Sequence, residues 1–297
     1  MESRCCHSSS WKQLFCRDLI VRLLSRNPDL QVKRLGKLGI VFSCTQHSRT
    51  CSALWHSDRS RYIDPYVQFK VSQLTLSSGA WAPSLSFING RYYLASMTRW
   101  TYDPFARVWP RVFFSSSEDL KTWTEPTWCE PWGIDPELFH DPNTGKTYLN
   151  LMAPNNNEQR LWGIYQCEVS LTTGSCVGEY ISLWNGTIPQ NSSTRAEGPK
   201  MFFKDKYYYL LIAEGGTDEL HRATIARSKS PKGPWTPAPN NPLIYNGAFG
   251  FKNLTVQSTG HATFVESAEG DWYASFLARR NINGSSPLGL HPAFCYS

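Results

Sequence analysis

The sequence predicts an all-β protein built from repeated sheets of the β-propeller type. Aromatic residues make up 14% of the 297 residues and charged residues only 18%, a balance typical of a stiff β scaffold or a sugar-binding cleft. A unit of two strands joined by a turn also recurs along the chain. Its spacing of about fifty to sixty-five residues fits one four-stranded propeller blade with its loops.

The recurring unit is an apolar strand, a turn and a Tyr-rich strand. Its first copy contains Asn89-Gly90 between alternating apolar residues, which is a strong hairpin signal. The four copies lie at residues 84–94, 137–149, 200–210 and 262–273. A β-sandwich with hairpins is the alternative interpretation of these pairs.

Two copies are followed by a second shared element. Residues 115–123 and 226–235 each read as the end of a strand, a turn and then a Trp. A repeat inside the repeated unit favours blades over a sandwich. About four blades are recognisable, and none is found upstream of residue 60.

We expect residues 1–60 to be an atypical, basic and Cys-rich segment foreign to the fold, and residues 61–297 to be the propeller domain, which is incomplete. The first fifty residues carry nine Lys/Arg against three Asp/Glu, whereas the rest of the chain is neutral. The net charge of +6 therefore gives no support to a nucleic-acid partner. An incorrectly joined first exon or a degenerate start explains the change in composition; a basic amphipathic membrane anchor is the alternative.

No stretch approaches the roughly 20 apolar residues of a transmembrane helix, so no membrane association is expected. No signal peptide is recognisable either, because Asp18 and Arg22 interrupt the early apolar residues. Cys167 and Cys176 are positioned to bridge a hairpin if the protein is secreted; if it is not, they remain free thiols.

Two carboxylates stand at the entrances of similar strands, about sixty residues apart. Asp135 precedes Pro136 at the start of the second unit, and Glu197 precedes Gly198-Pro199 at the start of the third. Equivalent corners of repeated sheets converge on one point, and a pair of convergent carboxylates is what hydrolysis of a glycosidic bond requires. Glu137 and Asp141 fit turn chemistry better and are left out of the predicted site.

An ordered set of short motifs between residues 70 and 290 resembles glycoside hydrolase family 43, whose members are five-bladed β-propeller enzymes that remove xylose or arabinose from plant polysaccharides. The resemblance is greatest to fungal β-xylosidase-like members. The motifs lie at residues 81–84, 133–139, 196–199, 214–217, 226–228 and 260–262, with Trp272-Tyr273 and Arg280 after them.

The resemblance implies that Glu197 is the general acid which protonates the leaving oxygen. Such a Glu has to stay protonated near neutral pH, through burial or a neighbouring negative charge. Asp135 would supply that charge and orient the acid. The structural alternatives are an exposed turn carboxylate for Glu197 and a turn-capping Asp before Pro for Asp135.

The resemblance also implies substrate-binding roles for Trp81, Thr217 and Arg280. Trp81 would form an apolar wall of the sugar subsite, or else belong to the core. Arg280 would bind sugar hydroxyls or pair with the acids, although the adjacent Arg279 is an alternative. His261 falls where the family places a ligand for water or calcium; a structural role is the alternative, so calcium is an option and no cofactor is required.

The general base that the family uses is not identified in this sequence. Asp18 and Asp29 lie near the expected position but outside an Asp-Pro context, and Asp64-Pro65 is the remaining upstream candidate. We expect an inverting hydrolase of xylan or arabinan, a β-xylosidase or α-L-arabinofuranosidase whose activity is impaired if the base is absent. A catalytically silent sugar-binding propeller is the alternative. The expected partner is a xylo- or arabino-oligosaccharide, the expected state a monomer and the expected location extracellular.

Overall fold

The computed structural model describes residues 79–99, 110–154, 162–189, 195–247, 256–267, 269–280 and 291–296. The predicted N-terminal segment 1–60 and the candidate bases Asp18, Asp29 and Asp64 lie outside these residues. Fifteen β-strands and no α-helix occur in the described part, so the all-β prediction is confirmed for it. No helix there is long and apolar enough to cross a membrane.

The strands form four antiparallel sheets, each built from consecutive strands. The first sheet contains β1 (Gly79–Ile88), β2 (Arg91–Arg99), β3 (Arg111–Ser117) and β4 (Thr127–Trp132). The second contains β5 (Ile134–His140), β6 (Thr147–Pro154), β7 (Trp162–Glu168) and β8 (Ile181–Ser182). The third contains β9 (Glu197–Lys204), β10 (Tyr207–Glu214), β11 (Arg222–Ser228) and β12 (Thr236–Pro237). The fourth contains β13 (Val256–Glu266), β14 (Trp272–Arg280) and β15 (His291–Tyr296).

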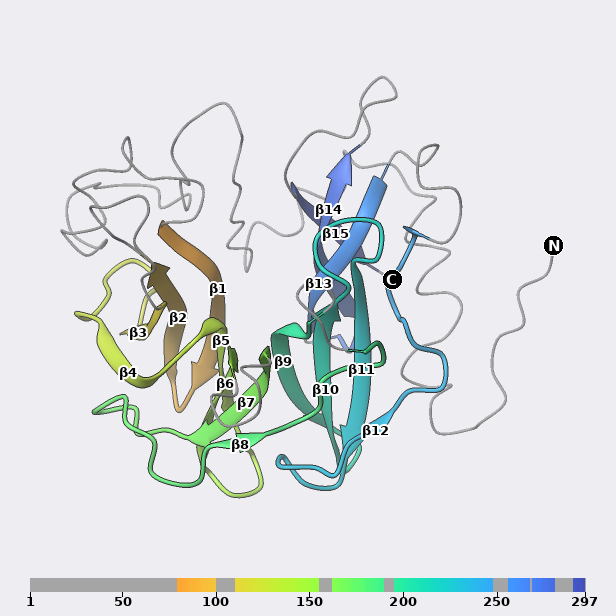
Figure 1. Cartoon of the computed structure of the whole chain (residues 1–297). Coiled ribbons are helices and arrows are strands. Elements are labelled where there is room, and N and C mark those ends of the chain that lie inside the picture. The colour runs from red at the N-terminus through yellow and green to blue at the C-terminus, as the bar shows by residue number, and fades with distance from the viewer. Residues whose placement is uncertain are drawn as a thin grey trace.

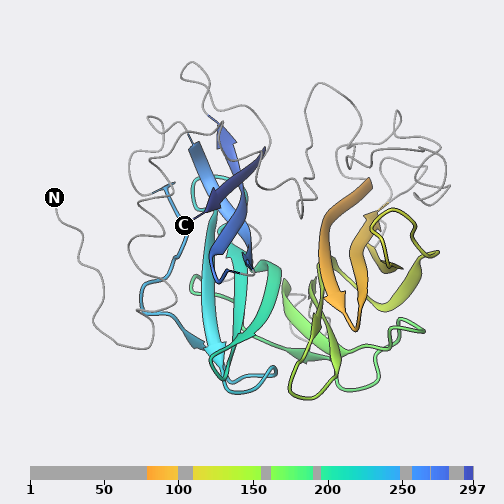
Figure 2. The same ribbon diagram turned by 180° about the vertical axis from the view of Figure 1, so that it is seen from behind.

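The four sheets follow one another in an arc, with the β1 sheet and the β13 sheet at its two ends (Figures 1 and 2). Strand β1 packs against β5, β5 against β9, and β13 against β9, β10 and β11. The first strands β1, β5, β9 and β13 are therefore the inner strands of their sheets, as in a propeller-type fold. The described residues do not form a closed ring.

Three apolar clusters fill the space between successive sheets. The first, around Met97, Phe114 and Leu149, joins sheets one and two. The second joins sheets two and three around Ile164 and Leu210, and the third joins sheets three and four. Burial of these side chains at roughly 25 cal/mol per Å² of apolar area is the main force that holds sheet to sheet.

The predicted hairpins are confirmed. Asn89 and Gly90 both have positive φ, at 50° and 82°, and join β1 to β2 as a two-residue turn. The corresponding turn of the third sheet uses Asp205 and Lys206, with φ of 49° and 67°. The short polar side chains of Asn and Asp tolerate this left-handed conformation better than most side chains do.

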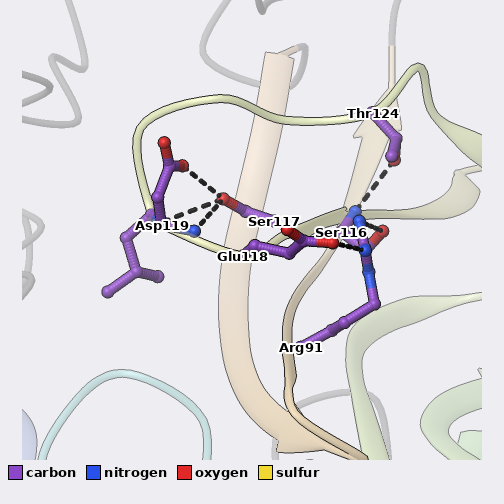
Figure 3. Close-up of polar contacts among 7 residues, drawn as sticks. Arg91, Ser116, Ser117, Glu118, Asp119 and Thr124 are labelled. Carbon is purple, nitrogen blue, oxygen red and sulfur yellow. Dashed lines mark hydrogen bonds and ion pairs between the residues drawn. The ribbon is translucent and has the colours of Figure 1, made fainter.

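The predicted strand–turn–Trp element is also present, and Figure 3 shows polar contacts in the turn of its first copy. At the end of β3, Ser117 Oγ accepts from the backbone N–H groups of Asp119 and Leu120, at 3.2 and 2.9 Å. Asp119 in turn accepts from Thr122 N and Lys121 N, and these bonds lower its pKa to about 2. The turn delivers Trp123 into the protein, where it is buried.

The predicted disulfide is present in the second sheet. Cys167 of β7 is bonded to Cys176, with a Cα–Cα distance of 5.7 Å. Cys129 is a free thiol beside this region, and burial raises its pKa to about 12. A thiol with so high a pKa is a poor nucleophile at neutral pH.

Candidate active site

Each inner strand contains a β-bulge at the same place. Two residues of the inner strand oppose one residue of the next strand, and the four pairs are Ala82-Pro83, Asp135-Pro136, Gly198-Pro199 and His261-Ala262. The first residue of every pair has positive φ, between 37° and 59°. Bulges redirect side chains, and they accept Pro because the bulged residue makes no ladder hydrogen bond. The four bulges therefore present one equivalent position per sheet.

This register refines the predicted placement of the two acids. Asp135 is equivalent to Gly198, not to Glu197, which stands one residue earlier. The expectation that both acids occupy equivalent corners is therefore wrong by one residue. The aligned triplets of the four inner strands, which end in Pro or Ala, are a sequence signal that would have given the correct register.

Asp135 lies beside the peptide that follows Glu197. Its carboxylate is 4% exposed, and its Oδ2 accepts a hydrogen bond from Gly198 N at 2.9 Å. The φ of 54° at Asp135 costs of the order of 1 kcal/mol for a residue with a side chain. The structure thus joins the bulge of β5 directly to the bulge of β9.

Glu197 is partly buried at the first position of β9. Burial, and then the negative charge of Asp135, raise its pKa to about 8, while the positive charge of Arg195 opposes the shift. A carboxyl group with that pKa is mostly protonated at pH 7. Glu197 has the protonation state that a general acid requires, and Asp135 is one of the two causes.

His261 completes the group of bulge residues around this point. Its Nε2 lies 3.9 Å from Asp135 Oδ2, and its side chain is 17% exposed. Burial lowers the pKa of His261, the Asp135 charge raises it and Lys200 lowers it further. A Cβ added at Gly198 would stand 2.5 Å from His261 Nε2, so only glycine leaves room for this ring. The imidazole is thereby held against β9 in its neutral form.

A second histidine lies against β13. His221 is fully buried and its Nδ1 lies 2.7 Å from the carbonyl oxygen of Ser258, so that Nδ1–H donates there. Burial is the main cause that lowers its pKa to about 4. His221 is therefore a neutral, structural histidine that contacts β13 three residues before the bulge at His261.

The described residues do not fit a metal centre. No group of three or more His, Cys, Asp or Glu side chains in the described ranges is arranged to hold an ion. The acidic neighbour of His261 is Asp135, whose oxygen already accepts from Gly198.

The predicted substrate-binding residues lie in three different parts of the fold. Trp81 is partly buried on β1 and packs against the first core cluster, just before the bulge at Ala82. Thr217 is exposed in the turn after β10. Arg280 is the last residue of β14, and its side chain lies outside the described part. The neighbouring Arg279 forms an ion pair with Asp218, next to Thr217, at 2.5 Å.

The prediction that Glu137 fits turn chemistry is wrong. Glu137 lies within β5, is 7% exposed and accepts from Met201 N with both carboxylate oxygens, at 2.8 and 2.9 Å. Asp141, in contrast, does shape the turn after β5, through Asn143 N and Thr144 Oγ1, and also accepts from Tyr208 of the third sheet. Both carboxylates tie sheet two to sheet three.

Comparison with known proteins identifies the class of protein. The sequence model of Glycosyl hydrolases family 43 matches residues 26–294. Because that match covers most of the chain, the protein belongs to glycoside hydrolase family 43, and the resemblance inferred from the motifs is confirmed.

The relatives that the chain resembles include xylosidases and an arabinofuranosidase. The chain is 31% identical to a xylan 1,3-beta-xylosidase of Vibrio sp over 279 residues, which are 90% of this chain and 51% of that protein. It is 32% identical to a non-reducing end alpha-L-arabinofuranosidase of Bacteroides ovatus, over 70% of this chain and 36% of that protein. Among solved structures, a xylan beta-1,4-xylosidase from Bacillus halodurans matches with a TM-score of 0.63 and 33% identity, over 74% of this chain and 41% of that one. The chain thus spans about half, or less, of the length of these relatives.

Proposed function

We propose that this chain is a glycoside hydrolase that removes xylose or L-arabinofuranose units from xylan- or arabinan-type polysaccharides with inversion of configuration. The observation that carries the proposal is the Asp135–Glu197 pair, in which a buried aspartate beside β9 helps to keep the neighbouring glutamic acid protonated. The names of the relatives support both sugars, because one is a xylosidase and another an arabinofuranosidase.

In the proposed reaction Glu197 donates its proton to the glycosidic oxygen as the bond to the anomeric carbon breaks. The negative charge of Asp135 destabilises the Glu197 carboxylate that forms, so Glu197 takes up a proton again readily after each turnover. A water molecule attacks the anomeric carbon from the opposite face and gives its proton to a general base. The products are the free sugar with inverted configuration and the leaving alcohol.

The general base is proposed to lie outside the described residues, and Asp64 is the first candidate to test. Trp81, Thr217 and Arg280 are proposed to bind the sugar. No cofactor is required by this reaction, since proton transfer and water attack use side chains alone. Calcium remains to be tested by adding the ion or a chelator.

The fold is proposed to be a five-bladed propeller whose fifth sheet lies between the β1 and β13 sheets. Phe87 on β1 and Val265 on β13 are 62% and 61% exposed, on the two end sheets of the arc. Large apolar side chains of this exposure are expected to be covered when a fifth sheet closes the ring. We further propose an extracellular monomer that binds neither nucleic acid nor membrane; the Cys167–Cys176 disulfide supports export.

The experiment is hydrolysis of aryl β-xylosides and aryl α-L-arabinofuranosides by the full chain, beside Glu197→Gln. Two leaving groups are compared for each sugar, an activated dinitrophenol and a poor alcohol. Turnover of the poor substrate that is lost in Glu197→Gln, with most turnover of the activated substrate retained, supports Glu197 as the acid. Equal loss on both substrates contradicts that role.

The alternative of a silent sugar-binding propeller makes a different prediction. Folded wild-type chain would then bind xylose or arabinose in calorimetry without turning over either substrate. Added azide separates a missing base from a missing function, because the azide anion can attack the anomeric carbon in place of water without a base to deprotonate it. Azide-dependent turnover, with glycosyl azide as product, means that the acid is present and the base is absent.

A further inference from the structure

Strand β9 is held by two carboxylates of the neighbouring strand β5. Asp135 accepts from Gly198 N, and Glu137 accepts from Met201 N. Glu197 is the residue directly before Gly198. We propose that Glu137 is a positioning residue for the general acid, which fixes the backbone of β9 so that Glu197 points at the glycosidic oxygen. The inference rests on the proposed role of Glu197.

The Glu137 side chain is oriented by a series of hydrogen bonds within sheet two. Asn150 Nδ2 of β6 donates to Glu137 Oε2 at 3.0 Å, and Gln166 Nε2 of β7 donates to Asn150 Oδ1 at 2.8 Å. Three strands of sheet two therefore orient one carboxylate toward one N–H group of sheet three. Such a connected buried network fixes position more firmly than a single contact does.

One anchor lies at the first residue of the bulge of β9, and the other lies just after the bulge. Gly198 and Met201 are three residues apart, or about 10 Å along an extended strand. Pro199, which lies between them, has no N–H group to hold the backbone itself. Strand β10 holds the other edge of β9. Without the second anchor, the edge of β9 that faces sheet two would be fixed at Gly198 alone, and the bulge could shift and displace Glu197.

The carboxylate form of Glu137 suits this task. An ionised carboxylate offers two acceptor oxygens, and both lie within 2.9 Å of Met201 N. Burial raises the pKa of Glu137 to about 6, while Lys200, Asn150 and Met201 oppose the shift. Glu137 is thus predominantly ionised at neutral pH, and both of its oxygens are available to accept.

Asp141 provides a matched control. It is another fully buried carboxylate that ties sheet two to sheet three, through Tyr208 Oη at 2.9 Å. Tyr208 pairs with Phe203, near the hairpin end of β9 and away from Glu197. Asp141→Asn therefore weakens the same junction without touching the bulge that carries the acid.

The experiment compares Glu137→Gln and Asp141→Asn in the full chain by two readouts. The first is the rate ratio between a dinitrophenyl glycoside and a poor-leaving-group glycoside of the sugar that the wild type cleaves. The second is deuterium exchange of the backbone amides of residues 197–201. We expect Glu137→Gln to raise the rate ratio by about tenfold or more, as partial loss of acid assistance does, and to speed exchange of this segment. Asp141→Asn should change neither, although it lowers the melting temperature.

Failure of this inference is distinguishable from failure of the proposed function. Folded wild type without turnover contradicts the proposed function, and the exchange readout alone then decides the role of Glu137. Unchanged exchange in Glu137→Gln overturns the inference, and so does an unchanged rate ratio in an active protein. If Glu137→Gln does not fold, Asn150→Ala removes the donor behind the carboxylate and should move both readouts in the same direction.

Discussion

Different polar groups join the inner strand β5 to its two neighbouring sheets, hydroxyls toward sheet one (the first junction) and carboxylates toward sheet three (the second junction). At the first junction the inner strands are tied by hydroxyls: Ser84 Oγ donates to Pro136 O and Ser86 Oγ to Leu138 O, both at 2.6 Å. At the second junction the ties are the carboxylates of Asp135, Glu137 and Asp141, which accept from sheet three.

The difference shows where the fold uses charge. A neutral hydroxyl is sufficient to join two inner strands, and its net contribution is about 1 kcal/mol. A buried carboxylate costs more to desolvate, yet three of them occur at the junction that carries Glu197. One of the three, Asp135, raises the pKa of Glu197, which a hydroxyl could not do. The charge of Asp135 therefore affects the proposed acid, Glu197, as well as joining the two sheets.

The largest effect is expected at the acid itself. Glu197→Gln should lower kcat on a poor-leaving-group glycoside by about 10²- to 10⁴-fold, because no proton is available for the leaving oxygen. Steady-state kinetics on the two leaving groups measures this. A similar loss in Ser84→Ala, where hydroxyls tie the inner strands, would contradict the distinction between the two junctions.

The pH profile tests the charge of Asp135. A general acid works only while it is protonated, so kcat/KM should be present below pH 8 and decline as the pH rises through about 8, the pKa of Glu197. In Asp135→Asn the negative charge is gone, and the alkaline limb should move to lower pH. A limb that stays in place would mean that burial alone sets the pKa of Glu197.

The disulfide provides a tie that lies within one sheet. Replacing Cys167 and Cys176 together with Ala should lower the free energy of unfolding by about 2–3 kcal/mol, as expected for a loop of this length. Denaturant unfolding measures the change. The leaving-group ratio should stay constant, because the bridge joins β7 to its own loop; a changed ratio would show that the second sheet moves as a whole.

The smallest effect is expected at the hydroxyl ties. Ser84→Ala and Ser86→Ala should each cost about 1 kcal/mol of stability, measured by thermal unfolding, and leave the pH profile unchanged. A shifted alkaline limb in either variant would show that the first junction also controls Glu197.

Much of this fold was predictable, because hairpin turns are encoded locally. Asn89-Gly90 specifies its turn through two residues that accept positive φ, and the Ser117–Trp123 element specifies its turn through side-chain bonds only a few residues long. Asp135 and Glu197 were found because their motifs repeat. Their exact register differs by one residue from the prediction, although the aligned triplets that end in Pro or Ala carry the signal for it.

Glu137 was missed for a physical reason. Its partner Met201 is 64 residues away in the sequence, and the local sequence around Glu137 does not predict that contact. A charged residue between Pro136 and Leu138, two apolar residues of a strand, was the available signal. The structural role of His221 was not predictable either, because the room for its ring depends on Gly260 of another sheet.

The most direct test of this account is the titration of the Glu197 carboxyl itself. Carbon-13 NMR of glutamate-labelled chain, with Glu197→Gln to assign the resonance, measures its pKa without any substrate. The account predicts a transition near pH 8 in the wild type and a lower one in Asp135→Asn. A wild-type pKa close to 4.5, the ordinary value for Glu, would contradict the claim that the carboxylate-tied junction holds Glu197 as an acid.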